Sequence, residues 1–186
     1  LNKLKRNNPK KLTFFFTESF RYVNAVQSFP TFEESNDYFD KMLSMLSNFP
    51  DTIKKNILLR NKANFGMNCS QKFADEFSVE QLDGTTQETY SDVFKTFNKT
   101  KLAIVSYPQT IYSQTMYLNI PTLLICNPNQ FYLEKDSLKL FKSLEKNKMA
   151  FSNYSKAKSH IIKNWENIDS WWNNKKMQKV RKKIFK

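Results

Sequence analysis

The stretch KLAIVSYPQTIYSQTMYLNIPTLLIC, from Lys101 to Cys126, decides the fold of this chain. Two short apolar runs, Leu102 to Val105 and Thr122 to Cys126, flank an amphipathic segment with helical spacing. Ser106-Tyr107-Pro108 precedes that segment and Asn119-Ile120-Pro121 follows it, and both are typical of turns. This order predicts a strand, a tight turn, a helix and a second strand, which together make one βαβ unit.

The helix of such a unit begins at the carboxyl end of its first strand, the edge where open α/β sheets bind ligands. Its unpaired N–H groups and the positive end of its dipole favour an anion. Pro108 suits the first turn because it has no N–H to leave unpaired. Gln109 and Thr110 then offer backbone N–H groups, and Thr110 adds a hydroxyl, so a diphosphate could bind here. Plain capping of the helix by Ser106 explains the sequence equally well.

Three further polar residues are expected near this helix start. Gln114 lies four residues after Thr110 and therefore on the same face of the helix. Arg60 ends a predicted strand and can bind phosphate through two parallel hydrogen bonds; an ion pair with Glu18 or Asp83 explains it equally well. Asp83 follows another predicted strand, and the carboxyl ends of parallel strands meet at one edge of a sheet.

Strands and helices alternate along the rest of the chain. Short apolar runs predict further strands at Leu12–Phe16, Asn56–Arg60, Ser78–Leu82 and Met149–Phe151. Amphipathic spacing predicts helices between Thr31 and Pro50 and at Ser70–Phe77, Thr86–Asn98, Leu133–Asn147, Ser155–Ile168 and Ser170–Phe185. The expected fold is α/β, a Rossmann-like open parallel sheet of about five or six strands with helices on both faces.

The length of 186 residues suits one domain. Residues 1–11 are basic and rich in Asn, and we expect them to be a linker or the end of a preceding domain. Residues 12–186 would then form the domain itself, with closing helices at about residues 155–185.

Composition narrows the function classes. The net charge is +13, but the basic residues are scattered and no zinc-finger, RNP or helix-turn-helix signature is present, so nucleic acid is not an expected partner. Cys69 and Cys126 lack metal-ligand spacing, and no apolar run approaches the roughly 20 residues of a membrane span. We expect a cytoplasmic protein with no metal ion or other cofactor.

The sequence disfavours two common catalytic designs. Its only histidine, His160, lies beside Ile161 on a late predicted helix and is expected to be structural, which disfavours Ser-His-Asp and Cys-His mechanisms. The two glycines, Gly66 and Gly84, cannot supply the glycine-rich motifs of P-loop or dinucleotide-binding proteins. The sequence identifies no catalytic residue.

The tail from Trp171 to Lys186 mixes apolar and basic residues. Such a helix can lie on an anionic membrane, or it can pack its apolar residues against the domain. We favour packing. A peripheral contact with the inner face of the cell membrane is the alternative.

Several motifs together resemble the C-terminal part of a bacterial family of transferases from surface-polysaccharide (O-antigen) loci, which look like GT-B-type glycosyltransferases. The resemblance runs from Leu12 to about Phe185. The matching pieces are Ile57-Leu58-Leu59-Arg60, Phe65-Gly66, Leu82-Asp83, Thr110, Asn119-Ile120-Pro121-Thr122, Trp165, Trp171-Trp172 and Arg181. Gln114 stands where the family usually has Glu, and Met67 where it usually has Trp. A Gln can still bind a hydroxyl but carries no charge, which puts donor preference and activity in question.

The resemblance implies that this domain binds the nucleotide and diphosphate of a nucleotide-sugar donor. An N-terminal domain of the same chain would bring a saccharide or lipid-linked acceptor and the catalytic base. Ser106, Gln109 and Thr110 would then hold phosphate and Arg60 would neutralise the leaving group. Gln114 and Asp83 would contact ribose or sugar hydroxyls. Two alternatives stay open, namely transfer of a polyol phosphate from a CDP-activated donor and a non-catalytic, degenerate binding module.

Overall fold

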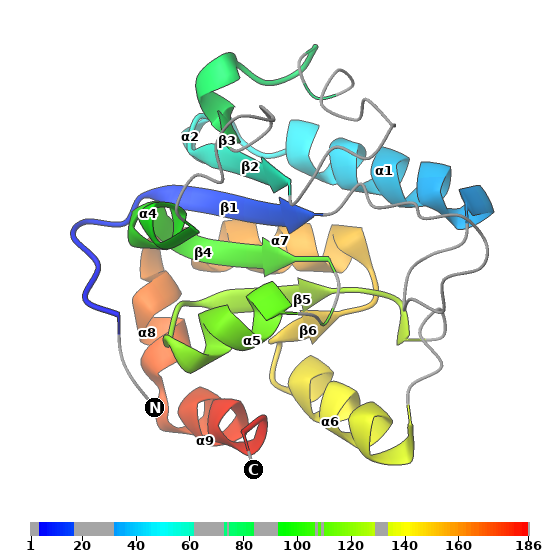
Figure 1. The fold of residues 1–186 in the computed structure, drawn as a ribbon, viewed down its shortest axis with the longest axis vertical. Helices are drawn as coiled ribbons and strands as arrows, with labels where there is room; N and C mark the ends of the chain where they lie inside the picture. The colour runs from blue at the N-terminus through cyan, green and yellow to red at the C-terminus, as the bar shows by residue number, and fades with distance from the viewer. Residues whose placement is uncertain are drawn as a thin grey trace.

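The protein is described by a computed structural model that covers residues 4–16, 32–61, 73, 75–83, 93–106, 108, 110–128 and 134–185, without the side chains of residues 32–36, 61, 79, 82 and 83. Six parallel strands form one sheet in the order β3-β2-β1-β4-β5-β6 (Figure 1). Their bounds are β1 Lys11–Phe16, β2 Ile57–Asn61, β3 Leu82–Asp83, β4 Thr100–Val105, β5 Thr122–Ile125 and β6 Ala150–Phe151. The predicted Rossmann-like parallel sheet is confirmed. Its strand order reverses between β1 and β4, which is the topological switch point of such a fold.

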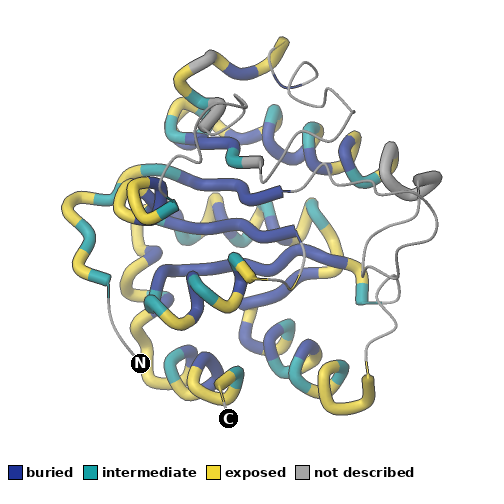
Figure 2. Tube along the Cα trace, viewed as in Figure 1, coloured by how far each residue is buried: buried dark blue, intermediate teal, exposed yellow. Residues whose placement is uncertain are grey.

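The strands form where the sequence is continuously apolar, because helices cover both faces of the sheet. In β1, Leu12, Phe14 and Phe16 enter one core and Phe15 enters the other. This alternation follows from the two-residue period of a strand. Figure 2 shows the central strands buried along their length, with exposed residues on the outer sides of the helices.

The helices lie in two layers. The bounds are α1 Phe32–Ser47, α2 Asp51–Lys54, α4 Val93–Lys99, α5 Thr110–Tyr117, α6 Lys135–Lys146, α7 Tyr154–Asn164, α8 Ile168–Asn173 and α9 Lys175–Lys183, with 3-10 turns at Val79–Gln81 and Trp165–Asn167. Residues of α1, α2 and α7 pack in one core, and residues of α4, α5, α6 and α9 pack in the other, while α8 contributes Ile168 to the first core and Trp172 to the second. The βαβ unit predicted at Lys101–Cys126 is therefore β4-α5-β5.

The predicted strand at Ser78–Leu82 is wrong in its bounds. Val79–Gln81 forms a 3-10 turn, and only Leu82 and Asp83 pair with β2. The Gln81 side chain explains the turn, because its oxygen accepts from the Ser78 N–H at 3.1 Å and its nitrogen donates to the Lys54 carbonyl at 2.9 Å. These two hydrogen bonds hold Gln81 at the end of the turn, and the strand begins only at Leu82.

The predicted helix at Ser170–Phe185 is also divided. The backbone of Asn174 is extended, and its side chain accepts a hydrogen bond from the Met177 N–H at 3.0 Å. Asn174 therefore ends α8 and caps the start of α9. Half of the predicted helix at Ser70–Phe77 lies outside the described residues, as does the part of the predicted helix at Thr86–Asn98 that precedes α4.

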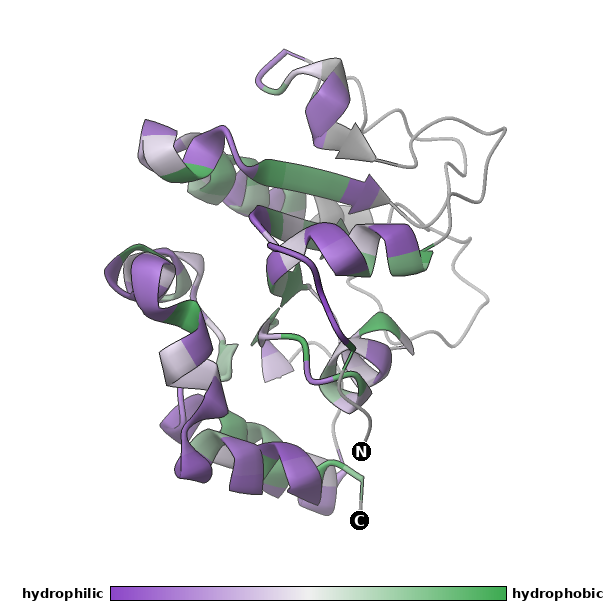
Figure 3. Ribbon diagram, turned by 90° about the vertical axis from the view of Figure 1, so that its left-hand side faces the viewer, coloured by the Kyte–Doolittle hydropathy of each residue, from purple (hydrophilic) through white to green (hydrophobic). Residues whose placement is uncertain are grey.

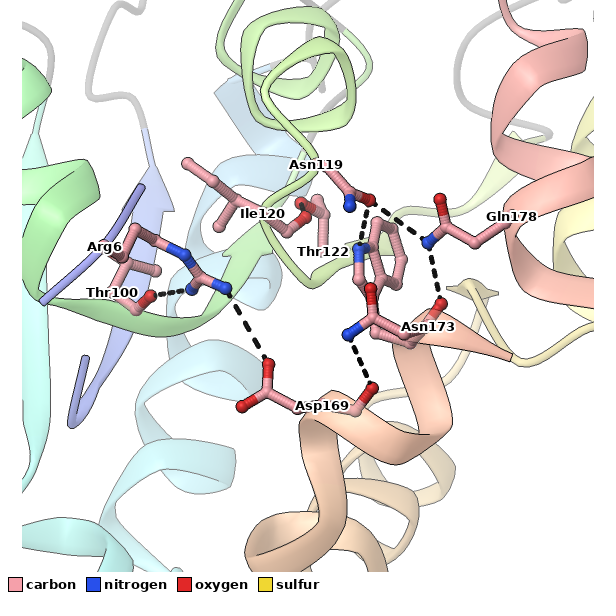
Figure 4. Close-up of polar contacts among 9 residues, drawn as sticks. Arg6, Thr100, Asn119, Ile120, Thr122, Asp169, Asn173 and Gln178 are labelled. Atoms are coloured by element: carbon pink, nitrogen blue, oxygen red, sulfur yellow. Dashed lines mark hydrogen bonds and ion pairs between the residues drawn. The ribbon is translucent and has the colours of Figure 1, made fainter. Parts of the chain in front are cut away.

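The closing helices are joined to the end of α5 by Asn119 (Figure 4). Asn119 has a φ of 58°, and the N–H of Ile120 bonds the Thr115 carbonyl at 2.9 Å, which is a Schellman-type helix end. The Asn119 side-chain oxygen accepts from the Trp172 indole at 2.9 Å and from Gln178 at 3.1 Å. A glycine could adopt this backbone but could not bind these two donors.

Arg181 completes the same junction. Its side chain is 4% exposed, and Nη1 donates to the Met116 carbonyl at 2.6 Å. Nε donates to the Gln178 side-chain oxygen at 3.0 Å. A cation at the carbonyl end of α5 also complements the helix dipole.

The segment before β1 is irregular but packs against the domain. The Leu4 N–H bonds the Leu118 carbonyl at 3.1 Å, at the end of α5. Arg6 donates to the carbonyl of Thr100 and lies 3.8 Å from the Asp169 carboxylate (Figure 4). The domain boundary near residue 11 remains a prediction.

Candidate functional site

The carboxyl ends of β1 and β4 mark the switch point of the sheet, where ligands bind in open α/β folds. Ser106 follows β4 at this point and is 4% exposed. Its hydroxyl accepts a hydrogen bond from the Tyr38 hydroxyl of α1 and lies 3.5 Å from the Phe15 carbonyl. These bonds hold Ser106 against α1 and β1. The alternative that Ser106 caps α5 stays a prediction, because the residue before α5 lies outside the described residues.

A cleft of about 590 Å³ opens beside Ser106, between α1 and the start of α7. Its floor is formed by the residues that end β4, β5 and β6. Polar side chains on its walls and rim include Asp37, Asp40, Lys41, Asn127, Ser155 and Lys158. The lining mixes both charges with amide and hydroxyl groups, which suits a ligand rich in hydroxyls.

Charge in this cleft is partly neutralised on α1, because Lys41 and Asp37 form an ion pair four residues apart. Cys126 also lines the cleft and is buried, which makes its thiol a poor nucleophile. Burial, with a smaller contribution from Glu145, raises the pKa of the Cys126 thiol to about 12. Since only the thiolate reacts, this thiol stays inert near neutral pH.

The start of α5 lies at the same edge of the sheet. Thr110 is the first residue of α5 and is exposed, as a ligand-binding hydroxyl requires. Gln114 is half-buried, and its side-chain oxygen is shielded from solvent without a hydrogen-bond donor among the described residues. A shielded acceptor of this kind is uncommon in folded proteins and marks a place where a further donor fits. Gln109 lies outside the described residues.

Arg60 and Asp83 lie side by side in the sheet, since Arg60 pairs with Phe15 of β1 and with Asp83 of β3. The Arg60 guanidinium donates to the Thr96 hydroxyl of α4 at 2.6 Å. It therefore lies on the face covered by α4, whereas the Ser106 hydroxyl meets α1 on the opposite face. The backbones of Arg60, Asp83 and Ser106 thus lie at one edge of the sheet, but the side chains of Arg60 and Ser106 point to opposite faces. The Asp83 side chain is outside the description.

Sequence reasoning missed the walls of the cleft. Tyr38 lies on α1 among Phe and Met residues, and its ring is partly buried against the core. A tyrosine among Phe and Met residues should have signalled a polar partner, because a buried phenol normally finds one. The partner is Ser106. The sequence could not place Asp37 and Lys158 in a cleft, since charged residues on helices are usually solvated.

The His160 ring packs between aromatic side chains, and its structural role stays a prediction. Its ring lies 5.4 Å from that of Phe151 and 5.2 Å from that of Trp171. Burial lowers the pKa of His160 from its usual 6.5, and the nearby Lys148 and Lys163 lower it further. The folded protein therefore favours the neutral ring.

This preference makes stability depend on pH. The unfolded chain binds the proton of His160 more tightly than the folded one, so the free energy of unfolding is expected to fall between about pH 7.5 and pH 5.5. Urea unfolding across this range measures the slope. In His160→Gln the slope should be much smaller, because no other histidine is present. An unchanged slope in that variant would contradict the assignment.

Among the described residues, no group of three or more His, Cys, Asp or Glu side chains is arranged to hold a metal ion. Among the same residues, no helix is both long and apolar enough to span a bilayer.

Comparison with known proteins identifies the family. A family model described as LIC12162 family transferase matches residues 1–186. No curated protein and no solved structure gives a significant match. The match covers all the described strands and helices, including the switch point and the closing helices. The chain therefore belongs to the LIC12162 family of transferases.

Proposed function

We propose that this chain is the donor-binding part of a glycosyltransferase that transfers a sugar from a nucleotide-sugar in surface-polysaccharide biosynthesis. The observation that carries the proposal is the cleft of about 590 Å³ at the carboxyl ends of β4, β5 and β6. It opens at the switch point of a Rossmann-like sheet, in a chain of a transferase family. This is where such sheets bind nucleotides.

The donor diphosphate would lie at the start of α5. Thr110 and the backbone of Gln109 would donate hydrogen bonds to it, aided by the helix dipole. The shielded oxygen of Gln114 would accept a hydrogen bond from a ribose or sugar hydroxyl. Because Gln114 is neutral, it would recognise the position of a hydroxyl group on the donor and not a charge.

The cleft would hold the hydroxyl-bearing end of the donor. Its carboxylates, amides and hydroxyls can satisfy a ring with many donors and acceptors. Arg60 and Asp83 would act at the neighbouring strand ends, where Arg60 would neutralise charge on the leaving diphosphate. The Thr96 hydroxyl holds the guanidinium close to its strand and limits its reach.

An N-terminal domain would supply the catalytic base and bind a saccharide or lipid-linked acceptor. This division is what the resemblance of the chain to GT-B-type glycosyltransferases implies. A transferase of this kind would work in the cytoplasm, where nucleotide-sugars are made.

Calorimetric titration of the full-length protein with UDP, GDP, CMP and CDP tests the proposal. We expect one of these nucleotides to bind, and Thr110→Val to weaken it by about tenfold, the effect of losing one hydrogen bond to a charged group. Arg60→Ala should weaken it similarly. Ser113→Ala, which removes an exposed hydroxyl from the same helix, and Lys55→Ala, which removes an exposed cation, are the matched controls.

Absence of nucleotide binding, or unchanged affinity in both site variants, would contradict the proposal. Selective binding of CDP, with transfer of a polyol phosphate from a CDP-linked donor, would favour a polyol-phosphate transferase. Binding without turnover of any donor would favour a degenerate module in which Gln114 has replaced an acid.

A further inference from the structure

The last helix, α9, exposes a row of lysines. Its sequence from Lys175 to Lys183 contains no acidic residue. The exposed members are Lys175, Lys176, Lys179, Lys182 and Lys183. At 3.6 residues per turn these side chains fall within an arc of about 120°. Among the described residues, none of the five forms an ion pair, so this face carries concentrated positive charge.

The opposite side of α9 is already occupied by the domain. Met177 and Val180 are each 7% exposed and pack in the core with residues of α5 and α6. Arg181 is buried at the end of α5. The expected packing of the tail is thereby confirmed, and α9 cannot insert its apolar stripe into a bilayer while it stays folded here.

Two aromatic rings stand beside the lysine face. Tyr117, the last residue of α5, is 44% exposed, and Phe185, just after α9, is 38% exposed. Their ring centroids are 5.9 Å apart in an edge-on contact. Among the described residues they are two of only four large apolar side chains with this much exposure. Figure 3 shows α9 as a largely hydrophilic helix at one end of the molecule.

We propose that the lysine face of α9, together with Tyr117 and Phe185, binds the surface of an anionic lipid bilayer. Each lysine close to such a surface strengthens binding by roughly fivefold. Stable association generally needs a second contribution besides charge. The aromatic pair supplies it, because a tyrosine and a neighbouring phenylalanine suit the boundary between headgroups and acyl chains.

The arrangement favours a bilayer over nucleic acid as the partner. The charge is carried by lysines on one convex helix, and the described surface there offers exposed rings that pack edge-on against each other. A nucleic-acid surface of this kind would use rings presented flat for base stacking and arginines for base edges. The one arginine of α9 is buried.

Vesicle flotation of the full-length protein tests this contact. We expect binding to vesicles of phosphatidylcholine with phosphatidylglycerol and none to pure phosphatidylcholine, with release at high salt. The triple variant Lys175→Glu/Lys179→Glu/Lys182→Glu should weaken binding by about 100-fold or more. Lys55→Glu/Lys95→Glu/Lys99→Glu makes the same change in net charge at exposed positions on other elements and should retain most of the binding.

A separate variant tests how much Tyr117 and Phe185 contribute to vesicle binding. Tyr117→Ala/Phe185→Ala should weaken binding while leaving its salt dependence unchanged. Equal losses in the two triple variants would overturn the proposal, because the effect would then come from net charge alone. Tighter binding to an oligonucleotide than to anionic vesicles would overturn it as well. Nucleotide titration of the α9 variants should be normal, so failure of this proposal is distinguishable from failure of the proposed function.

Discussion

Replacing Trp172 with alanine is expected to lower the free energy of unfolding by about 3 to 5 kcal/mol, the usual cost of removing a large buried aromatic side chain. Trp172 is 1% exposed and belongs to the core shared by α5, α6 and α9. Its indole N–H also bonds Asn119 at 2.9 Å. The variant therefore loses both packing and the contact that holds α8 against the end of α5. Chemical denaturation followed by tryptophan fluorescence and circular dichroism measures the change.

Two variants separate these contributions. Trp172→Phe keeps much of the ring volume but removes the indole N–H, so it should cost clearly less than Trp172→Ala. Trp171→Ala removes a half-buried neighbour whose indole makes no hydrogen bond within the described residues, and it should cost less still. If Trp172→Ala were no more costly than Trp171→Ala, the junction would not contribute as the structure indicates.

Replacing Arg181 with methionine is expected to cost about 2 to 3 kcal/mol, since a hydrogen bond to a charged group is worth that order and a buried acceptor is left unpaired. Methionine retains the aliphatic length, so the loss reports mainly on the bonds to Met116 and Gln178. Burial lowers the pKa of Arg181, yet an arginine remains charged at neutral pH. The variant thus also removes a cation from the carbonyl end of α5.

Lys182→Met is the matched control, because it also replaces a cationic side chain with methionine, at the next residue, where the side chain is exposed. Its effect should stay within about 0.5 kcal/mol. Both variants can be measured by the denaturation used for Trp172. Equal effects for residues 181 and 182 would show that the buried position of Arg181 is not what stabilises the domain.

Much of the fold was predictable because local pattern and burial agree. The run Leu12–Phe16 is apolar throughout since both sheet faces are covered, and it forms β1. The prediction at Ser78–Leu82 was wrong because the Gln81 side chain bonds the backbone at Lys54, a contact between segments that the local pattern does not encode. Asn174 could have been identified as a helix cap. The helical spacing of apolar residues continues on both sides of it, however, and so predicted one helix where there are two.

The candidate site was less predictable. Sequence could place Ser106 and Arg60 at strand ends, but not the faces to which they point, because those depend on the register of pairing. The cleft needs α1 to face the start of α7, and these elements are more than 100 residues apart in the chain. Only the three-dimensional fold brings Tyr38 to Ser106.

The two outermost strands, β3 and β6, have two residues each, whereas β1 and β4 at the centre have six. A long bare edge strand exposes a row of unpaired N–H and C=O groups, which can recruit a strand from another molecule. Within the described residues, edges this short offer almost no template for such pairing. The tapering of the sheet therefore protects a chain rich in apolar strands from adding to itself and forming fibres.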